Sequence, residues 1–277
     1  MAPAPAMTVT LPAWSGAFSE AERAGLAREL PIGALARETV FGDADGAGVT
    51  IAVIDSGVDA GHPAIGGRVA RHLRVDVDAE GAHVVDDGAG GDVVGHGTAC
   101  AGIVAGIAPG ADIVAIRVLG ADNRGKGLAL AAAVDWAIEQ RIAVVNLSLS
   151  SRSDALYGAF HDLADRAYFA NTLLVCAANN IAGPSYPSLF AAVMSVAAHD
   201  VPDPEVWFYN PHPPVEFGAF GVDVDVAWRD GGRIRATGNS FAAPHLAGQA
   251  ARLRSRHPAA TPFEVKALLA ATASRLA

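Results

Sequence analysis

The chain has few cysteines and no long uncharged apolar run, and both features exclude classes of protein to which it could belong. Only two cysteines, Cys100 and Cys176, occur in 277 residues. Neither has a second Cys or a paired His at metal-ligand spacing, which argues against a disulfide framework and against structural zinc. Both are expected to be buried free thiols in a reducing compartment. No stretch of 18 apolar residues is free of charge, so a membrane-spanning helix is not expected.

The chain also lacks the features that direct a protein to nucleic acid, to a membrane or to secretion. Its net charge is −9 and no basic run occurs, which argues against a nucleic-acid surface or an anionic membrane as the main partner. The first residues have neither the basic start nor the apolar segment of a secretory signal. A cytoplasmic monomer is therefore expected, although a mature secreted fragment with an added Met would look the same.

The apolar residues, 51% of the chain, fall into alternating strand-like and helix-like segments. Continuous apolar strands that alternate with helices indicate a parallel sheet buried on both faces. The predicted fold class is α/β, a doubly wound and mostly parallel central sheet with helices on both faces. The strands are expected at Val49–Ile54, Ile113–Val118, Ala143–Leu149, Leu173–Ala178 and Val193–Ala197, and the helices at Gly127–Gln140, Asp154–Ala170 and Ser240–Arg256.

We divide the chain into an N-terminal extension and linker, residues 1–48, and a catalytic domain, residues 49–277. The extension contains a short amphipathic helix candidate from Ser19 to Leu30, followed by Pro31. Pro202–Pro214 is interpreted as an irregular surface loop. Residues Pro262–Ala277 are predicted to form a closing helix, with Thr261 as N-cap and proline at the first helical position.

Three separated blocks place an Asp, a His and a Ser in that order along the chain. They are Val53-Ile54-Asp55-Ser56-Gly57, Gly95-His96-Gly97-Thr98 and Gly238-Asn239-Ser240-Phe241. A serine hydroxyl needs a neighbouring base to attack an amide, and histidine has a pKa suited to that role. A buried carboxylate can hold the imidazole in one tautomer. Each residue alone could be a turn former or a helix cap, but the three contexts together favour a catalytic triad.

At these residues the chain resembles the subtilisin-like serine proteases, and the resemblance runs from about Val49 to the C-terminus. It implies a serine endopeptidase in which Asp55 orients, His96 is acid and base, and Ser240 is the nucleophile. Pro244 is expected in the first helical turn after Ser240, where an N–H needs no partner. The resemblance also implies that Asn180 and the backbone N–H of Ser240 stabilise the oxyanion.

The chain departs from the family pattern at two positions beside these residues. Asn179 stands where the family usually has Gly, and a left-handed backbone at Asn179 would make that departure mild. Asn239 stands where the family usually has Thr directly before the nucleophile. A supporting role for the Asn239 amide at the oxyanion is expected, with a slower reaction.

The resemblance implies that an extended peptide substrate pairs with exposed backbone in a groove. Arg124 and Lys126 beside that groove are compatible with acidic residues upstream of the cut or with a solvated basic loop. The pocket walls would accept medium to large hydrophobic residues. The residues expected to bind substrate are Asn123, Arg124, Gly125, Ser148, Leu149, Ser150, Ala177, Ala178, Asn179, Ser185 and Asn239.

No cofactor is expected, and no tight calcium site of the usual family kind. The residue after His62-Pro63 is Ala64, where relatives use an Asp, and residues 103–109 run on with no inserted calcium loop. The acidic runs 76–78, 86–87 and 223–225 are interpreted as solvated loops or strand faces. The expected activity is peptide-bond hydrolysis, and the expected role is that of a dedicated intracellular or precursor-processing protease. The alternative is a catalytically silent peptide-binding module that keeps only the groove.

Overall fold

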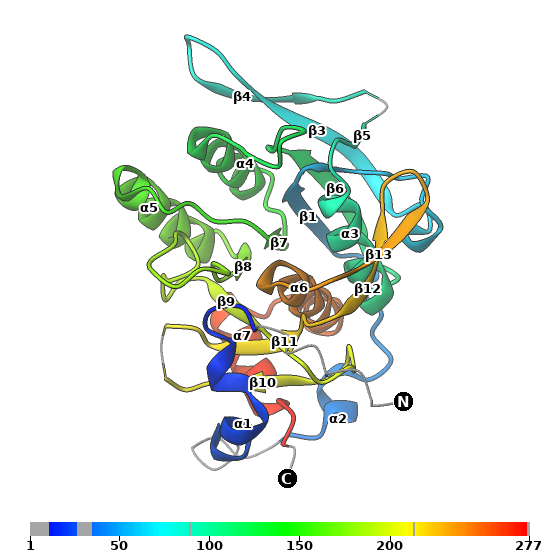
Figure 1. The fold of residues 1–277 in the computed structure, drawn as a ribbon. Coiled ribbons are helices and arrows are strands. Elements are labelled where there is room, and N and C mark those ends of the chain that lie inside the picture. Colours follow the sequence, from blue (N-terminus) through cyan, green and yellow to red (C-terminus); the bar gives the residue numbers. More distant parts are fainter. Residues whose placement is uncertain (1–10, 27–34, 89, 213, 276–277) are drawn as a thin grey trace, which may run out of the picture.

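The structure is a computed structural model, and it describes residues 11–26, 35–88, 90–212 and 214–275. Its centre is a nine-stranded sheet in the order β10-β11-β9-β8-β7-β1-β6-β3-β4 (Figure 1). Every pairing from β11 through β3 is parallel, and the two outermost pairs are antiparallel. The strands are β1 (Thr50–Asp55), β3 (Val69–Val77), β4 (Ala82–Asp86), β6 (Asp112–Arg117), β7 (Val144–Leu147), β8 (Leu173–Ala177), β9 (Met194–His199), β10 (Trp207–Tyr209) and β11 (Phe217–Phe220).

Two small antiparallel pairs lie outside the main sheet. β2 (Gly57–Val58) pairs with β5 (Gly91–Asp92), and β12 (Val224–Trp228) forms a hairpin with β13 (Gly232–Ala236). Across that hairpin Asp223 pairs with Arg235, and Asp225 with Arg233. The acidic run at 223–225 therefore belongs to a solvated strand face.

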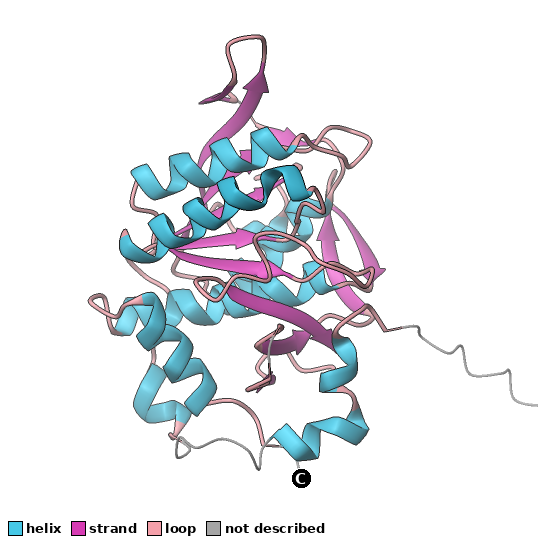
Figure 2. Cartoon of the chain, turned by 90° about the vertical axis from the view of Figure 1, so that its left-hand side faces the viewer, coloured by secondary structure: helices cyan, strands magenta, loops and turns pink. Residues whose placement is uncertain are grey.

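Helices cover both faces of the sheet (Figure 2). One apolar cluster joins it to α3 (His96–Ile107), α6 (Asn239–Arg256) and α7 (Pro262–Ala271). A second cluster on the other face joins it to α4 (Gly127–Glu139) and α5 (Tyr157–Phe169). This arrangement confirms the predicted fold class. The short helical segments are η1 (Ser15–Phe18), α1 (Glu20–Leu26), α2 (Arg37–Phe41), η2 (Pro63–Ile65) and η3 (Asp154–Leu156).

The strongly apolar predicted elements are found where expected, with boundaries shifted by up to three residues. The closing helix ends at Ala271, earlier than predicted, and its Thr261 N-cap forms a capping box with Glu264. The interpretation of Pro202–Pro214 as an irregular surface loop is wrong at its centre. Trp207 and Phe208, 1% and 2% exposed, lie in β10, because their rings are buried against the edge of the core.

The first described residues pack against the body of the fold. η1 and α1 lie beside β9, β10 and β11 (Figure 1). The predicted helix from Ser19 to Leu30 is observed from Glu20 to Leu26, and its expected end lies outside the described residues. Among the helices that the structure describes, none has the length and apolarity needed to cross a membrane.

Candidate active site

The fold brings the three sequence blocks to one edge of the sheet. Asp55 is the last residue of β1, a central strand, and His96 is the first residue of α3. Ser240 lies in the first turn of α6, which packs against α3. Both helices follow strands of the small antiparallel pairs, β5 and β13. Their first turns meet the carboxyl end of β1, the place where sites of open α/β sheets form, so residues 41 and 185 positions apart in the chain reach one site.

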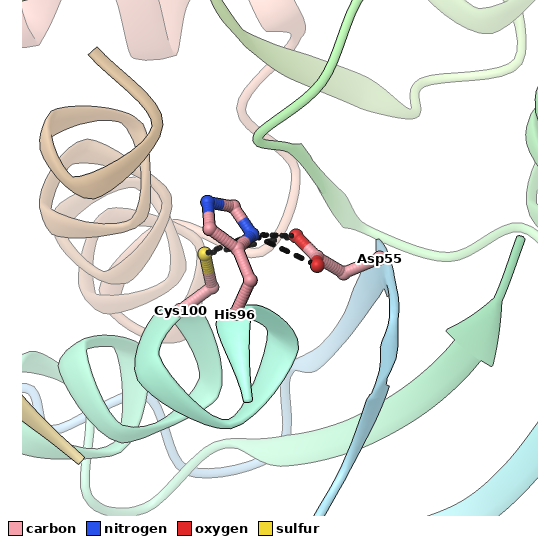
Figure 3. Close-up of side chains that lie close together, drawn as sticks. All are labelled: Asp55, His96 and Cys100. Atoms are coloured by element: carbon pink, nitrogen blue, oxygen red, sulfur yellow. Dashed lines mark hydrogen bonds and ion pairs between the residues drawn. The ribbon is translucent and has the colours of Figure 1, made fainter. Parts of the chain in front are cut away.

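Asp55 and His96 are in direct contact at the centre of the site. Nδ1 of His96 lies 2.9 Å from each carboxylate oxygen of Asp55 (Figure 3). Asp55 is fully buried, and the Ser56 N–H donates to its Oδ1 at 2.7 Å. The close approach needs Gly97, because a Cβ there would lie 2.0 Å from the Gly57 carbonyl oxygen. The carboxylate thus fixes which imidazole nitrogen points toward the pocket.

The surroundings of His96 act on its pKa in opposite directions. Burial disfavours the imidazolium and by itself lowers the pKa, but the negative charge of Asp55 and its hydrogen bond outweigh burial. The pKa of His96 is therefore raised well above 6.5. An imidazole with a raised pKa is a stronger base. As the pH falls, it is also protonated, and loses its active neutral form, at a higher pH than an ordinary histidine does.

Ser240, His96 and Asn180 line one pocket. A Cβ placed on Gly238 would lie 3.2 Å from Oγ of Ser240 and 3.4 Å from Nδ2 of Asn180. Both polar atoms therefore border the same small space, which a side chain at residue 238 would occupy. The N–H of Ser240 lies in the first turn of α6, where backbone donors have no intrahelical acceptor.

The backbone carbonyl of Ser240 is bound by two side chains from other elements. Pro244 lies inside α6, not at a position without a partner, which corrects the sequence-based expectation. The carbonyl of Ser240 would normally accept from the N–H at residue 244, and proline has none. Ser148 Oγ donates to it at 2.7 Å, and Cys100 Sγ lies 3.6 Å away. Asn146 in turn donates to the Ser148 hydroxyl at 3.0 Å.

Asn180 is oriented by the residue that precedes the nucleophile. The N–H of Asn239 donates to Oδ1 of Asn180 at 2.8 Å. Because Oδ1 is the acceptor, the Nδ2 donor faces the other way, toward the pocket. Asn179 is not among the residues with a positive φ. Asn180 therefore reaches the pocket without a left-handed backbone at residue 179.

The side chain of Asn239 does not reach the oxyanion position, contrary to expectation. It is fully buried, and its Nδ2 donates to the carbonyls of Ala13 and Ala178, each at 3.0 Å. Its Oδ1 accepts from the Ala198 N–H at 2.9 Å. This amide has no donor left for substrate, so its role is to bind neighbouring backbone.

The pocket has a volume of about 660 Å³, and six of the eleven expected substrate-binding residues line it. Asn123, Arg124, Gly125, Ser148, Leu149 and Ser150 line it. The other five candidates do not line the pocket. Ala177 and Ala178 belong to the core and are 4% and 3% exposed. The remaining three bind neighbouring groups: Asn179 Oδ1 accepts from the Ile181 N–H, the fully buried Ser185 hydroxyl bonds with the Ser188 hydroxyl, and Asn239 binds backbone.

One cluster of metal-ligand side chains occurs in the described part of the chain. Single ligand atoms of Asp55, His96 and Cys100 lie within 4.8 Å of one another. One carboxylate, one imidazole and one thiol do not resemble the six to eight oxygens that Ca²⁺ prefers. Burial raises the pKa of Cys100, which keeps this residue a neutral thiol. The absence of a tight calcium site stays a prediction.

The contacts that Ser148 and Cys100 make with the catalytic residues were not predicted from the sequence. Ser148 was predicted to contact substrate, but its hydroxyl binds the Ser240 carbonyl. Cys100 was expected to be a buried free thiol, which it is, and its Sγ also lies 3.9 Å from Nδ1 of His96. One signal was available: Pro244, four residues after Ser240, removes a helix donor and therefore calls for another.

Comparisons with known proteins agree with this geometry. Residues 46–277 match the Subtilase family. The chain is 33% identical to "Thermostable alkaline protease" of Halalkalibacterium halodurans over 83% of its own length, and it spans 63% of that relative. It is 29% identical to "Subtilisin DY" of Bacillus licheniformis, with 83% of this chain and 85% of that protein covered. Among solved structures, "S41 Psychrophilic Protease" superposes with a TM-score of 0.70 at 28% identity, over 84% of this chain and 87% of that one.

Proposed function

The chain belongs to the subtilase family of serine proteases, and we propose that it is a dedicated processing endopeptidase for peptides with acidic residues near the cleaved bond. The observation that carries the chemistry is the 2.9 Å contact between His96 and Asp55 beside a pocket that Ser240 and Asn180 share. The observation that carries the selectivity is the charge of the pocket lining.

The proposed reaction uses each group in one role. As Ser240 Oγ bonds to the scissile carbonyl carbon, its proton passes to Nε2 of His96, and Asp55 stabilises the imidazolium. The oxyanion accepts hydrogen bonds from the Ser240 N–H and from Nδ2 of Asn180. The imidazolium then gives its proton to the leaving amine. Water cleaves the acyl-enzyme by the same route and restores the Ser240 hydroxyl.

The pocket is basic although the whole chain carries a net charge of −9. Arg124, Lys126 and Arg152 line it, and no Asp or Glu is among its described lining residues. Within the described chain, none of these three side chains has an ion pair or a hydrogen bond. Unpaired cations around a concave site attract carboxylates and raise the local concentration of acidic substrates. We propose an extended acidic peptide, bound by a single chain, as the partner.

Matched peptide pairs that differ by Glu against Gln at one position test this proposal. We expect kcat/KM to favour the Glu peptide by about fivefold to tenfold, as three partly solvated ion pairs allow, and the preference to shrink in 0.5 M NaCl. The triple variant Arg124→Gln, Lys126→Gln, Arg152→Gln should lose it. Arg141→Gln, an exposed cation outside the pocket, is the control. Equal rates for both peptides at low salt contradict the acidic preference and leave the protease chemistry intact.

A further inference from the structure

The first described residues of the chain reach the loop that carries the oxyanion donor. We call residues 11–26, which include η1 and α1, the N-terminal strap. The N–H of Ala13 donates to the carbonyl of Asn180 at 3.0 Å, and the carbonyl of Ala13 accepts from Nδ2 of Asn239 at 3.0 Å. Both backbone groups of one strap residue thus bind the two asparagines beside the nucleophile.

The loop at Asn180 needs such support. Asn180 follows the end of β8 at Ala177 and is exposed, and a loop beyond a strand has no ladder partner of its own. The backbone carbonyls of three successive residues, Ala178, Asn179 and Asn180, all accept bonds from Asn239 or from the strap. The Asn239 N–H then orients the Asn180 side chain. Ala13 therefore completes a set of bonds around the donor.

The strap is fastened to the body of the protein by a buried ring. Phe18 is fully buried among Ala178, Ala197, Phe208 and Val215. It packs on Gly218, where a Cβ would lie 2.5 Å from the ring. Burial of a phenylalanine side chain is worth roughly 1.5–3 kcal/mol, more than the net gain from one backbone hydrogen bond. The position of Ala13 thus depends on the anchor at Phe18.

A second fastening lies one turn further along. Arg23 forms an ion pair with Asp200 at 2.7 Å, and its guanidinium lies 5.4 Å from the centre of the Phe208 ring. The buried Ser15 hydroxyl lies 3.5 Å from Oδ1 of Asn239. Ala13 is therefore followed along the strap by three further residues, Ser15, Phe18 and Arg23, that each contact the body of the protein.

We propose that the N-terminal strap is a positioning element of the oxyanion site, and that it acts on catalysis through Asn180. The strap touches neither substrate nor the reacting atoms. Its effect comes from holding the Asn180 backbone, so that Nδ2 stays where negative charge develops. The buried Asn239 fits this role: it exchanges hydrogen bonds with the strap and with the donor loop, which a threonine side chain has too few donors to do.

The test is a double-mutant cycle between the anchor and the donor. Phe18→Ala should lower kcat on a peptide anilide about tenfold, a fraction of the loss from removing an oxyanion donor, while KM changes less than twofold. It should also weaken a peptide aldehyde inhibitor, whose hemiacetal oxygen occupies the oxyanion position. In an Asn180→Ala background, Phe18→Ala should change kcat and inhibitor binding less than twofold.

Control variants separate positioning from loss of the fold. Phe169→Ala removes a phenylalanine that is 84% exposed and should leave kcat unchanged. Phe18→Leu should retain most of the activity. If Phe18→Ala unfolds the protein, Phe18→Leu replaces it in the double-mutant cycle. An equal loss of kcat in both backgrounds, or no loss while hydrogen exchange shows the strap released, overturns the proposal. The cycle depends only on peptide hydrolysis, so its failure is distinct from failure of the acidic preference.

Discussion

The hydroxyl of Ser148 donates a 2.7 Å hydrogen bond to the backbone carbonyl of Ser240. It replaces the helix bond that Pro244 cannot supply, since proline has no N–H. The first turn of α6 carries the nucleophile, and this bond ties that turn to the end of β7. The position of Ser240 therefore depends on a neighbouring strand as well as on its own helix.

Removing this hydroxyl should slow the reaction. In Ser148→Ala the Ser240 carbonyl keeps only the weak thiol contact of Cys100, which leaves a buried acceptor poorly satisfied. We expect a loss of about 1–3 kcal/mol in the free energy of unfolding and a lower kcat. The matched control is Ser255→Ala, since the Ser255 hydroxyl donates to the Ala47 carbonyl at 2.8 Å in the last turn of the same helix. Chemical denaturation and steady-state kinetics measure both effects, and equal kcat values for the two variants contradict the role of Ser148.

Loss of the oxyanion donor should affect turnover more than binding. Asn180→Ala is expected to lower kcat about a hundred- to a thousandfold with little change in KM, the loss measured in the relative subtilisin. Asn179→Ala is the neighbouring control, because Oδ1 of Asn179 accepts a local bond from the Ile181 N–H and Asn179 does not line the pocket. Similar kcat losses in both variants argue that the loop as a whole, not the Asn180 amide, supports the reaction.

The raised pKa of His96 predicts an acid limit for activity. Peptide hydrolysis needs the neutral imidazole, and Asp55 holds the pKa of His96 above 6.5 despite burial. The rate kcat/KM should therefore fall as the pH drops through a midpoint above 6.5. Asp55→Asn removes the charge that raises the pKa, and should lower kcat by about ten-thousandfold. A midpoint below 6.5 in the pH profile of the wild-type protein would contradict a raised pKa of His96.

Two other buried histidines predict a loss of stability in acid. Burial lowers the pKa of His199 and of His245 to about 4 in each case. Between pH 6.5 and 4 the unfolded chain binds protons that the folded chain does not, so stability rises with pH across this window and is lost as the pH falls. Each histidine contributes on the order of 1.4 kcal/mol per pH unit.

The variant His245→Asn isolates one of these contributions. It keeps a donor for the Phe241 carbonyl, which Nδ1 of His245 contacts at 2.9 Å. Urea unfolding at several pH values should show a shallower decline of stability in this variant than in wild type. His161→Asn, with a side chain 51% exposed in wild type, controls for the change of residue type. Parallel curves for His245→Asn and wild type contradict the assignment.

The sequence allowed prediction of the triad and the inner strands for a physical reason. Strands buried on both faces are largely apolar, and β8 shows this along its whole length, β1 except at Thr50 and Asp55, and β7 except at Asn146. Strands at or next to the edge of a sheet carry no such signal: β3 and β13 are mostly exposed or half-buried, and their residues resemble loop residues. Both were missed.

The parts of the site that could not be predicted use backbone groups. The contacts of Ala13 with Asn180 and Asn239 run through an N–H and a carbonyl that every non-proline residue has. Residue type therefore gave no hint of them. Asn239 was recognised as unusual, but the direction of its side chain is set by Ala13, Ala178 and Ala198, which are distant in the sequence.

Labelling with a fluorophosphonate, followed by peptide mapping, shows whether Ser240 is an activated nucleophile. We expect one probe per chain, bound to Ser240, and no labelling of Ser240→Ala. Cleavage of a diverse peptide library should stop in both the labelled protein and the variant. An unlabelled Ser240 in folded protein that still binds peptides without cleaving them would contradict the assignment of Ser240 as nucleophile and would favour a peptide-binding module.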